Sequence, residues 1–402
     1  MADTRQRTLE LAEQIAKVLH APPQRLASET QERTLAYMEA SARALGILEA
    51  LPGIMATVTY SIGTSGRDFS TMTSWEAELD NGALFSAGDD AVGECYNDSA
   101  FDEDVTINGG GTLGLNSVTL TVASGERHDG TAGSGARVVA STGRQLNLRP
   151  PAGFDEKYIV EWLEWDQNGQ SEASVSTSGA SFGSVPSIRN MLVHDQDGGA
   201  AFNGFVAASS RDIRIANCVF YNNSRASGST VRGLYLDADR ASGGLFNTTV
   251  YNVENTSTGG CIGVTCLTNS TNTKVKNTIC IDTSAGGSTS DFSFGSNADH
   301  DYNLSSDSTA DGTNSITSGT ASNLFVSTVA GSEDLHLKTG ADAIDAGVDL
   351  GTTPSGVEVD INGRDRDSNG DTWDIGAHEF VSAGGGFNAF LASNATVVLS
   401  NA

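Results

Sequence analysis

Residues 187–195 read Ser-Ile-Arg-Asn-Met-Leu-Val-His-Asp, and the same pattern returns without a gap at residues 214–222, 244–252 and 274–282. The fourth position of each stretch is an Asn, so the repeat lengths are 27, 30 and 30 residues between Asn190, Asn217, Asn247 and Asn277. Two positions earlier stands an apolar residue: Ile188, Ile215, Leu245 and Val275. A fixed period of this length, built from short β-rich segments, is typical of a solenoid whose coils stack on one another.

The Asn column has a structural explanation. Parallel strands of successive coils lie about 4.8 Å apart, so Asn side chains in one column can bond to their equivalents one coil up and down. We therefore expect a structural ladder of Asn190, Asn217, Asn247 and Asn277, with the apolar column directed inward and roughly a dozen coils in the rod. The alignment creates a second polar column from Asp195, Asn222, Asn252 and Asp282.

The chain of 402 residues is strongly acidic, because 23 basic and 50 acidic side chains give a formal net charge of −27. A field of that sign repels nucleic acid and anionic membranes. We therefore expect partners that are neutral, cationic or protein, and neither nucleic acid nor a membrane.

The five Cys residues are expected to be buried free thiols, although a disulfide between Cys261 and Cys266 is an alternative. No apolar run approaches the ~18 residues that span a bilayer, and no basic-then-apolar leader opens the chain. These features predict synthesis in a cytoplasm.

Residues 1–54 have the pattern of two amphipathic helices, which predicts an N-terminal α-helical hairpin. This segment could lie on its own domain, or it could dock on another protein or on symmetry mates. We favour the second interpretation, an N-terminal helical anchor, because a β-helix does not need so long a polar-faced helical leader. The apolar residues that would form the anchoring interface are Leu9, Ile15, Leu19, Leu35, Met38 and Leu45.

Beyond the anchor the sequence is β-rich and divides into four further segments. Residues 55–154 are predicted to hold the N-terminal cap and the first coils, with a short helix around Trp75 that plugs the open end. Residues 155–310 form the regular coils. Residues 311–382 form a C-terminal closing module, and residues 383–402 form a Gly-rich linker with an apolar tail strand.

The proposed closing module contains four motifs in order: Asp-Leu-His-Leu-Lys at 334–338, Ala-Ile-Asp-Ala-Gly at 343–347, Asp-Ile-Asn-Gly-Arg at 360–364 and Asp-Ile-Gly-Ala-His-Glu-Phe at 374–380. This set resembles the module that ends the solenoid in right-handed parallel β-helix proteins of the pectate-lyase-like type. Residues 61–71 and 93–98 look like the start of β-helix proteins common in bacteria and their phages. The resemblance covers about residues 57–380. It implies an all-β, right-handed parallel β-helix, in a family that includes polysaccharide lyases and hydrolases, adhesins, tailspikes and capsid cement proteins.

Catalysis of glycoside hydrolysis would need two carboxylates about 5–9.5 Å apart. Three pairs at positions i and i+2 would each share a face of a regular strand: Glu164 and Asp166, Asp195 and Asp197, and Asp237 and Asp239. With 50 acidic residues such pairs arise by chance, and none adjoins the basic cluster that a lyase needs. We therefore interpret them as surface carboxylates and predict no catalytic residue.

His194 stands next to Asp195 and could be a general base. Its column continues with Tyr221, Tyr251 and Ile281, which favours a packed imidazole instead.

Residues 365–371 place oxygen ligands at alternate positions before and after a Gly, as in the first half of a calcium loop. The ligands of such a site would be Asp365, Asp367, Asn369 and Asp371. Gly376 stands where the loop would need a bidentate Glu, so a plain Asn-Gly turn between two strands is the other interpretation.

Together these features favour a non-enzymatic structural protein on the surface of a phage virion. We expect a homotrimeric, tailspike-like decoration or spike, bound through its N-terminal helices to the major capsid protein or another virion protein, and able to bind glycans. The alternatives are a tailspike that depolymerises polysaccharide, as a lyase or glycoside hydrolase, and a bacterial surface adhesin.

Overall fold

The computed structural model describes residues 56–154, 157–177, 185–197, 203–208, 213–236, 243–266, 273–367 and 372–381. The expected helical hairpin of residues 1–54, with its six anchor residues, lies outside this range, as does the expected tail of residues 383–402. The described chain is a parallel β-solenoid of about seven turns with almost no helix, which confirms the all-β solenoid class.

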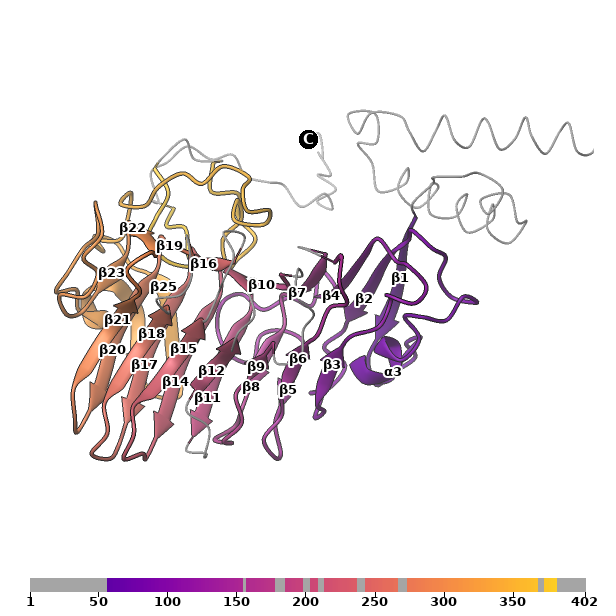
Figure 1. Cartoon of the computed structure of the whole chain (residues 1–402), viewed down its shortest axis with the longest axis horizontal. Coiled ribbons are helices and arrows are strands. Elements are labelled where there is room, and N and C mark those ends of the chain that lie inside the picture. Colours follow the sequence, from indigo (N-terminus) through magenta and orange to yellow (C-terminus); the bar gives the residue numbers. More distant parts are fainter. Residues whose placement is uncertain are drawn as a thin grey trace, which may run out of the picture.

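Three parallel sheets run along the solenoid (Figure 1). Sheet A has nine strands in the order β1 (Thr57–Ile62), β2 (Asp90–Cys95), β4 (Ser117–Val122), β7 (Tyr158–Glu161), β10 (Ser187–Arg189), β13 (Arg214–Ala216), β16 (Gly244–Phe246), β19 (Lys274–Lys276) and β22 (Asp299–Asp301). Sheet B consists of β5 (Arg137–Val139), β8 (Glu164–Asp166), β11 (Leu192–Asp197), β14 (Val219–Arg225), β17 (Thr249–Asn255), β20 (Ile279–Ala285) and β23 (Leu304–Ser305). Sheet C consists of β3 (Val105–Ile107), β6 (Leu146–Leu148), β9 (Val175–Ser176), β12 (Asn203–Ala208), β15 (Val231–Leu236), β18 (Cys261–Cys266) and β21 (Thr289–Phe294).

Each regular coil passes once through sheets A, B and C before it returns to sheet A one strand further along. The register matches the repeat that the sequence predicts, because Ile188 pairs with Ile215, Ile215 with Leu245 and Leu245 with Val275. All four of these side chains are fully buried inside the solenoid. Each coil therefore contributes one inward apolar side chain to a continuous column at this level of sheet A.

The corner between sheets A and B has two residues, and the first of them has left-handed backbone. Asn190, Asn217, Asn247 and Asn277 hold it with φ between 44° and 53°. Asn adopts this conformation more readily than most residues, because its short polar side chain can bond locally. By register, Trp162 and Tyr302, also with positive φ, hold the same corner in the coils before and after the four Asn residues.

The first coil is closed by helix α3 (Met72–Glu76), as the sequence predicts. Thr71 caps it, since its side chain accepts from the Ser74 amide while Ser74 bonds back to the Thr71 backbone. Met72 and Trp75 are fully buried, and Trp75 lies so close to Gly93 of β2 that a Cβ there would stand 2.7 Å from the indole. The helix thus covers the apolar end that the first strands would otherwise expose.

Residues 321–381 differ from the expectation. They were expected to end the rod, but they fold back along its flank (Figure 1). Helix α4 (Ala321–Leu324) and the antiparallel pair β24 (Phe325–Val329) and β25 (Ser332–Leu337) pack with the loops that follow on the outer face of sheet B. We call residues 321–381 the flank module. Because they add no coils, the rod has about seven turns, not a dozen.

The flank module explains why sheet B is apolar on both sides. Val193, Phe220 and Val250 point into the solenoid, whereas Leu192, Tyr221, Tyr251, Ile279 and Ile281 point outward and join Leu324, Phe325, Leu335, Ile361 and Ile375 in a second core. A third cluster sets Val357 and Trp373 against Ala216 and Phe246 on the outside of sheet A. Parallel sheets are commonly covered on both faces in this way.

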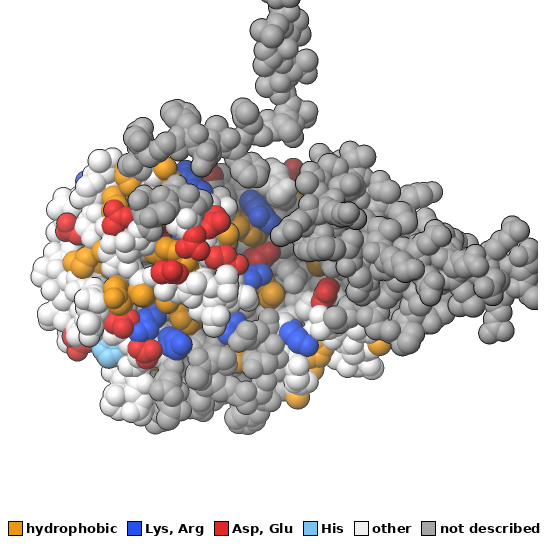
Figure 2. All heavy atoms as spheres, turned by 90° about the horizontal axis from the view of Figure 1, so that it is seen from above, with side chains coloured by type: hydrophobic (Ala, Val, Ile, Leu, Met, Phe, Trp, Pro, Cys, Tyr) orange, Lys and Arg blue, Asp and Glu red, His pale blue; other side chains and the backbone are white. Residues whose placement is uncertain are grey.

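All five Cys residues are buried thiols, and no disulfide joins Cys261 to Cys266. None of the helices in the described part of the chain is apolar and long enough to cross a membrane. Seen from above, acidic and basic side chains lie intermixed over the coloured part of the surface (Figure 2), so this face does not present a field of one sign.

Candidate functional site

The structure gathers three of the predicted acidic residues around His194. Strands β8 and β11 are neighbours in sheet B, and Asp166 pairs in register with His194. Trp165 points into the core, so Glu164 and Asp166 on either side of it point outward, as the i and i+2 spacing predicts. His194 is outward-facing on the next strand and therefore lies directly beside them.

Both nitrogens of His194 have carboxylate partners. Nε2 lies 3.1 Å from Glu164 Oε1, and Nδ1 lies 3.0 Å from Asp195 Oδ2 and 3.9 Å from Asp166 Oδ1. The side chains of His194 and Glu164 are 3% and 2% exposed, whereas those of Asp166 and Asp195 are 21% and 46% exposed. The cluster is thus closed on the Glu164 side and reaches solvent on the Asp195 side.

The backbone at Asp195 explains how it reaches His194. Its φ is 55°, so the strand is not regular there. The prediction that Asp195 and Asp197 share one face required a regular strand, so it does not apply to this pair. Asp197 is exposed further along the strand. The same left-handed conformation returns at Asn222, Asn252 and Asp282, which makes the second polar column a row of bulges.

The second polar column is also a hydrogen-bonded ladder. Asn222 Nδ2 donates to Asp195 Oδ1 at 2.9 Å, and Asn252 Nδ2 donates to Asn222 Oδ1 at 2.9 Å. Asn222 Nδ2 also donates to Glu333 Oε1 of β25 at 2.8 Å. The His194 cluster is therefore connected through Asn222 to the flank module.

The charge state of the cluster follows from its neighbours. Burial alone would lower the pKa of His194, but hydrogen bonds to Asp195 and Glu164 and the nearby charge of Asp166 outweigh it and raise the pKa to about 9. Burial raises the pKa of Asp166, although His194 acts against it. Burial also acts to raise the pKa of Asp195, but its bonds to His194 and Asn222 prevail and lower it.

This arrangement is poorly suited to general base catalysis by His194. A base needs a free nitrogen within reach of substrate, but both ring nitrogens face carboxylates and the ring stacks on Tyr221 at 4.9 Å. The carboxylate of Glu164 is also hydrogen-bonded within the protein, because the Gly133 amide lies 2.9 Å from each of its oxygens. The packed imidazole expected from the sequence is what the structure shows.

The remaining predicted residues are only partly described. Asp237 and Asp239 lie outside the described residues, as do Asn369 and Asp371 of the calcium hypothesis. In the described half of that turn, Asp365 Oδ1 accepts from the Asp367 amide at 2.9 Å. Asp367 Oδ1 accepts from the Trp373 indole at 2.8 Å, so this oxygen already has a partner within the flank module.

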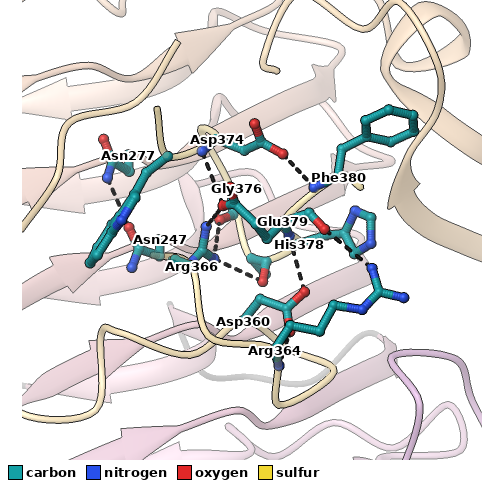
Figure 3. Close-up of polar contacts among 12 residues, drawn as sticks. Asn247, Asn277, Asp360, Arg364, Arg366, Asp374, Gly376, His378, Glu379 and Phe380 are labelled. Carbon is teal, nitrogen blue, oxygen red and sulfur yellow. Dashed lines mark hydrogen bonds and ion pairs between the residues drawn. The ribbon is translucent and has the colours of Figure 1, made fainter. Parts of the chain in front are cut away.

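The Asn side chains of the A–B corner bond along their column and also outward to the flank module (Figure 3). Asn247 donates to Asn217 at 3.1 Å, and Asn277 donates to Asn247 at 2.9 Å. The same side chains also bond outward, to the carbonyls of Val357 and Val348. The other outward bonds join Asn190 to Asp360 and Asn217 to Gly356. The ladder is therefore the surface on which residues 348–360 dock.

A buried ion pair between Arg366 and Glu379 joins the loops that carry the motifs at residues 360–364 and 374–380. Arg366 donates to Glu379 Oε2 at 2.8 Å and to the carbonyls of Gly376 and Ala377 at 2.9 and 3.0 Å. Asp360 accepts from the Glu379 amide (Figure 3). Burial raises the pKa of Glu379 to about 7 despite Arg366. It raises that of Asp374 to about 6, although backbone amides and Arg366 act against it.

Sequence reasoning missed a polar row on the outside of sheet A. By register Glu94, Thr121, Glu161 and Arg189 follow one another on β2, β4, β7 and β10. Glu161 accepts from Thr121 at 3.0 Å and pairs with Arg189 at 2.9 Å. The sequence contained a signal for this row. Once Trp162 is aligned with Asn190, Glu161 occupies the same position as Arg189, directly before the corner residue.

Comparison of the chain with known protein families, with curated proteins and with solved structures finds no match. The fold therefore stands on the geometry alone. The likeness of the C-terminal motifs to a closing module, and the tailspike type, remain interpretations of the sequence.

Proposed function

We propose that this protein is a non-enzymatic structural component of a phage particle. In this proposal the chain is a right-handed parallel β-helix that stands on the virion surface as a decoration or spike. Residues 1–54 anchor it to the capsid or to another virion protein, and the chain forms a homotrimer. The resemblance of the sequence to tailspike-like proteins supports this interpretation, and so do the repeated coils of a rod that is stiffened by two polar ladders.

One observation carries the non-enzymatic part of the proposal. Two of the six carboxylates that sequence analysis selected as catalytic candidates are used by the protein itself, since Glu164 and Asp195 hold His194 while Gly133 and Asn222 hold them in turn. Glycoside hydrolysis needs one carboxyl group to protonate the leaving group and another to face the sugar or a water. Here the imidazole occupies the space between the carboxylates.

A second candidate function, cleavage of polysaccharide, is favoured by the polar row of sheet A. Glu94 and Glu161 point outward on β2 and β7, with β4 between them. Two strand spacings of about 4.8 Å separate them, near the upper end of the range of about 6.5–9.5 Å for an inverting pair. Arg189 and Thr121 bond to Glu161 and thereby stabilise its ionised form, which disfavours Glu161 as a general acid. The Glu161 side chain is nevertheless only partly buried.

The experiment is an incubation of the full chain with a panel of capsular and marine polysaccharides, followed by assays for reducing ends and unsaturated sugars. The structural proposal predicts no release by the wild type. Release that survives in Glu164→Gln and Asp195→Asn but is lost in Glu161→Gln would assign the activity to the sheet A row and overturn the non-enzymatic proposal. Binding of glycan without cleavage would fit a receptor-binding spike.

Attachment is tested separately. A chain that lacks residues 1–54 should remain a folded rod by circular dichroism but should no longer sediment with phage particles. The full chain should sediment with them and should behave as a trimer in analytical ultracentrifugation. Full occupancy by the truncated chain would sink the anchor hypothesis and move attachment to the solenoid.

A further inference from the structure

The three groups on the open side of His194 face one another at ligand distances. His194 Nδ1, a carboxylate oxygen of Asp166 and one of Asp195 all lie within 4.8 Å of one another. Two ligands of a zinc ion, each at about 2.0–2.2 Å, lie at most about 4.4 Å apart. Nδ1 is already 3.0 Å from Asp195 and 3.9 Å from Asp166, so only small rotations of two partly exposed carboxylates are needed.

The imidazole is oriented as it is in protein metal sites. A ligand His usually donates its other ring N–H to a carboxylate, which fixes the ring and leaves one nitrogen free for the ion. Glu164 supplies that carboxylate at 3.1 Å from Nε2, and the Gly133 amide holds Glu164 in turn. Tyr221 stacks on the ring with 11° between the planes, so the direction of Nδ1 is set from two sides.

The two carboxylates are also held in place. Asp195 Oδ1 accepts from Asn222 at 2.9 Å, while the other oxygen, Oδ2, faces His194. Asp166 Oδ1 accepts from the Asn168 amide at 2.6 Å. In Asp166 the oxygen held by Asn168 is also the one that lies 3.9 Å from Nδ1. Both carboxylates are therefore oriented by the protein with an oxygen toward His194.

We propose that Asp166, His194 and Asp195 bind one divalent transition-metal ion of the zinc type, with Glu164 as the residue that positions His194. One imidazole nitrogen and two carboxylate oxygens suit zinc and its neighbours better than calcium, which prefers oxygen ligands alone. Asp195 is 46% exposed, so an ion can enter from that side and water can complete its coordination. The site lies on β8 and β11 and shares no residue with the calcium hypothesis.

The role of such an ion would be structural. It would join two neighbouring coils, and through Asp195, Asn222 and Glu333 it would stabilise the contact between sheet B and β25 of the flank module. This inference does not depend on the virion proposal, because a rod with any function could use it.

The test uses the full chain without a histidine tag, stripped with EDTA and then titrated with ZnCl₂ in a calorimeter. We expect one ion per chain and a higher melting temperature with zinc. Asp166→Asn and Asp195→Asn should each weaken binding at least about tenfold, and Glu164→Gln should weaken it by about 10–100-fold through loss of orientation. Asp197→Asn is the matched control on the same strand, and it should bind as the wild type does.

Co²⁺ provides a second readout, because its visible absorption reports nitrogen ligation and should be lost in His194→Gln. If that variant does not fold, the zinc affinity of Asp166→Asn tests the site instead, because the Asp166 side chain is partly exposed and its replacement should not prevent folding. Absence of binding by the wild type at millimolar zinc would overturn the proposal. Equal affinity of Asp195→Asn and Asp197→Asn would overturn it as well, and loss of zinc only in Asp365→Asn would assign the ion to the turn.

Discussion

The coils and the flank module are stabilised in different ways. In the coils every third strand repeats the same environment, so each inward apolar side chain stacks on its equivalent and each corner Asn bonds to the next. The flank module contains a buried ion pair, Arg366 with Glu379, whose side chains are 0% and 2% exposed. A repeated structure distributes its stability over many equal contacts, whereas a loop-rich module depends on a few.

The interface between the two regions combines both kinds of contact. Residues 348–360 have little regular structure of their own, yet their carbonyls align with the corner Asn side chains. Gly376 shows how closely the module approaches, because its amide donates to Asn277 and a Cβ there would stand 2.7 Å from Ile279. The regular column thus provides a template that orders an irregular segment.

The largest effect should come from Arg366→Ala, which leaves Glu379 buried without its partner. Removal of one member of a buried ion pair costs about 3–5 kcal/mol. Hydrogen exchange should show residues 343–379 opening while the amides of β14 and β17 stay protected. Arg364→Ala is the control, since Arg364 is exposed and its loss should change little. Loss of protection in both regions together would mean that they form one cooperative unit.

Next is Asn247→Ala in the middle of the corner ladder. Asn247 is fully buried, donates to Asn217 and to Val357, and accepts from Asn277. Buried groups that lose their partner cost about 1–3 kcal/mol, and Ala at φ 44° adds strain. Chemical denaturation should show a loss of about 2–4 kcal/mol. A melting curve equal to that of the wild type would show that the ladder is not a stabilising element.

The sequence predicted the parts of the molecule that repeat. A fixed spacing brings equal residues into one column, and that predicted the Asn ladder, the inward apolar column and the parallel solenoid. The flank module could not be placed in this way, because it depends on contacts between residues more than 100 positions apart, such as Asn222 with Glu333. A signal was present in Met191-Leu192-Val193, which is apolar on both faces of a strand and therefore indicates a covered sheet.

The His194 cluster was predicted only in part. Strand alternation correctly put Glu164 and Asp166 on one face, and the column of Tyr221 and Tyr251 correctly indicated a packed ring. The left-handed backbone at Asp195 could not be derived from spacing, because an Asp is compatible with both a regular strand and a bulge. That one dihedral angle decides whether Asp195 continues the strand or turns to His194.

A pH dependence should separate the two regions further. The raised pKa values of Glu379, about 7, and Asp374, about 6, mean that these two side chains hold more protons in the folded module than in the unfolded chain between about pH 4 and pH 7. Their contribution to stability should therefore be full below that window and should fall as the pH rises to about 7. His378, whose pKa burial lowers to about 2, acts in the opposite direction below about pH 6.5. Proteolysis of the module should become faster over this window, and Glu379→Gln should flatten the dependence. An equally steep profile in that variant would exclude Glu379 as its cause.

The smallest effect should come from Asn252→Ala, the counterpart of Asn247→Ala in the outer ladder. Both residues have left-handed backbone, with φ of 55° and 44°, so the strain introduced by Ala is similar in both variants. Asn252 is half-buried and donates one side-chain bond, to Asn222, whereas Asn247 is buried with three. The loss for Asn252→Ala should be about 1–2 kcal/mol, mostly strain, because water can replace the lost partner. The difference between the two variants measures what burial and the docked flank module add to the corner ladder, and equal losses would show that backbone conformation alone explains why Asn recurs in both columns.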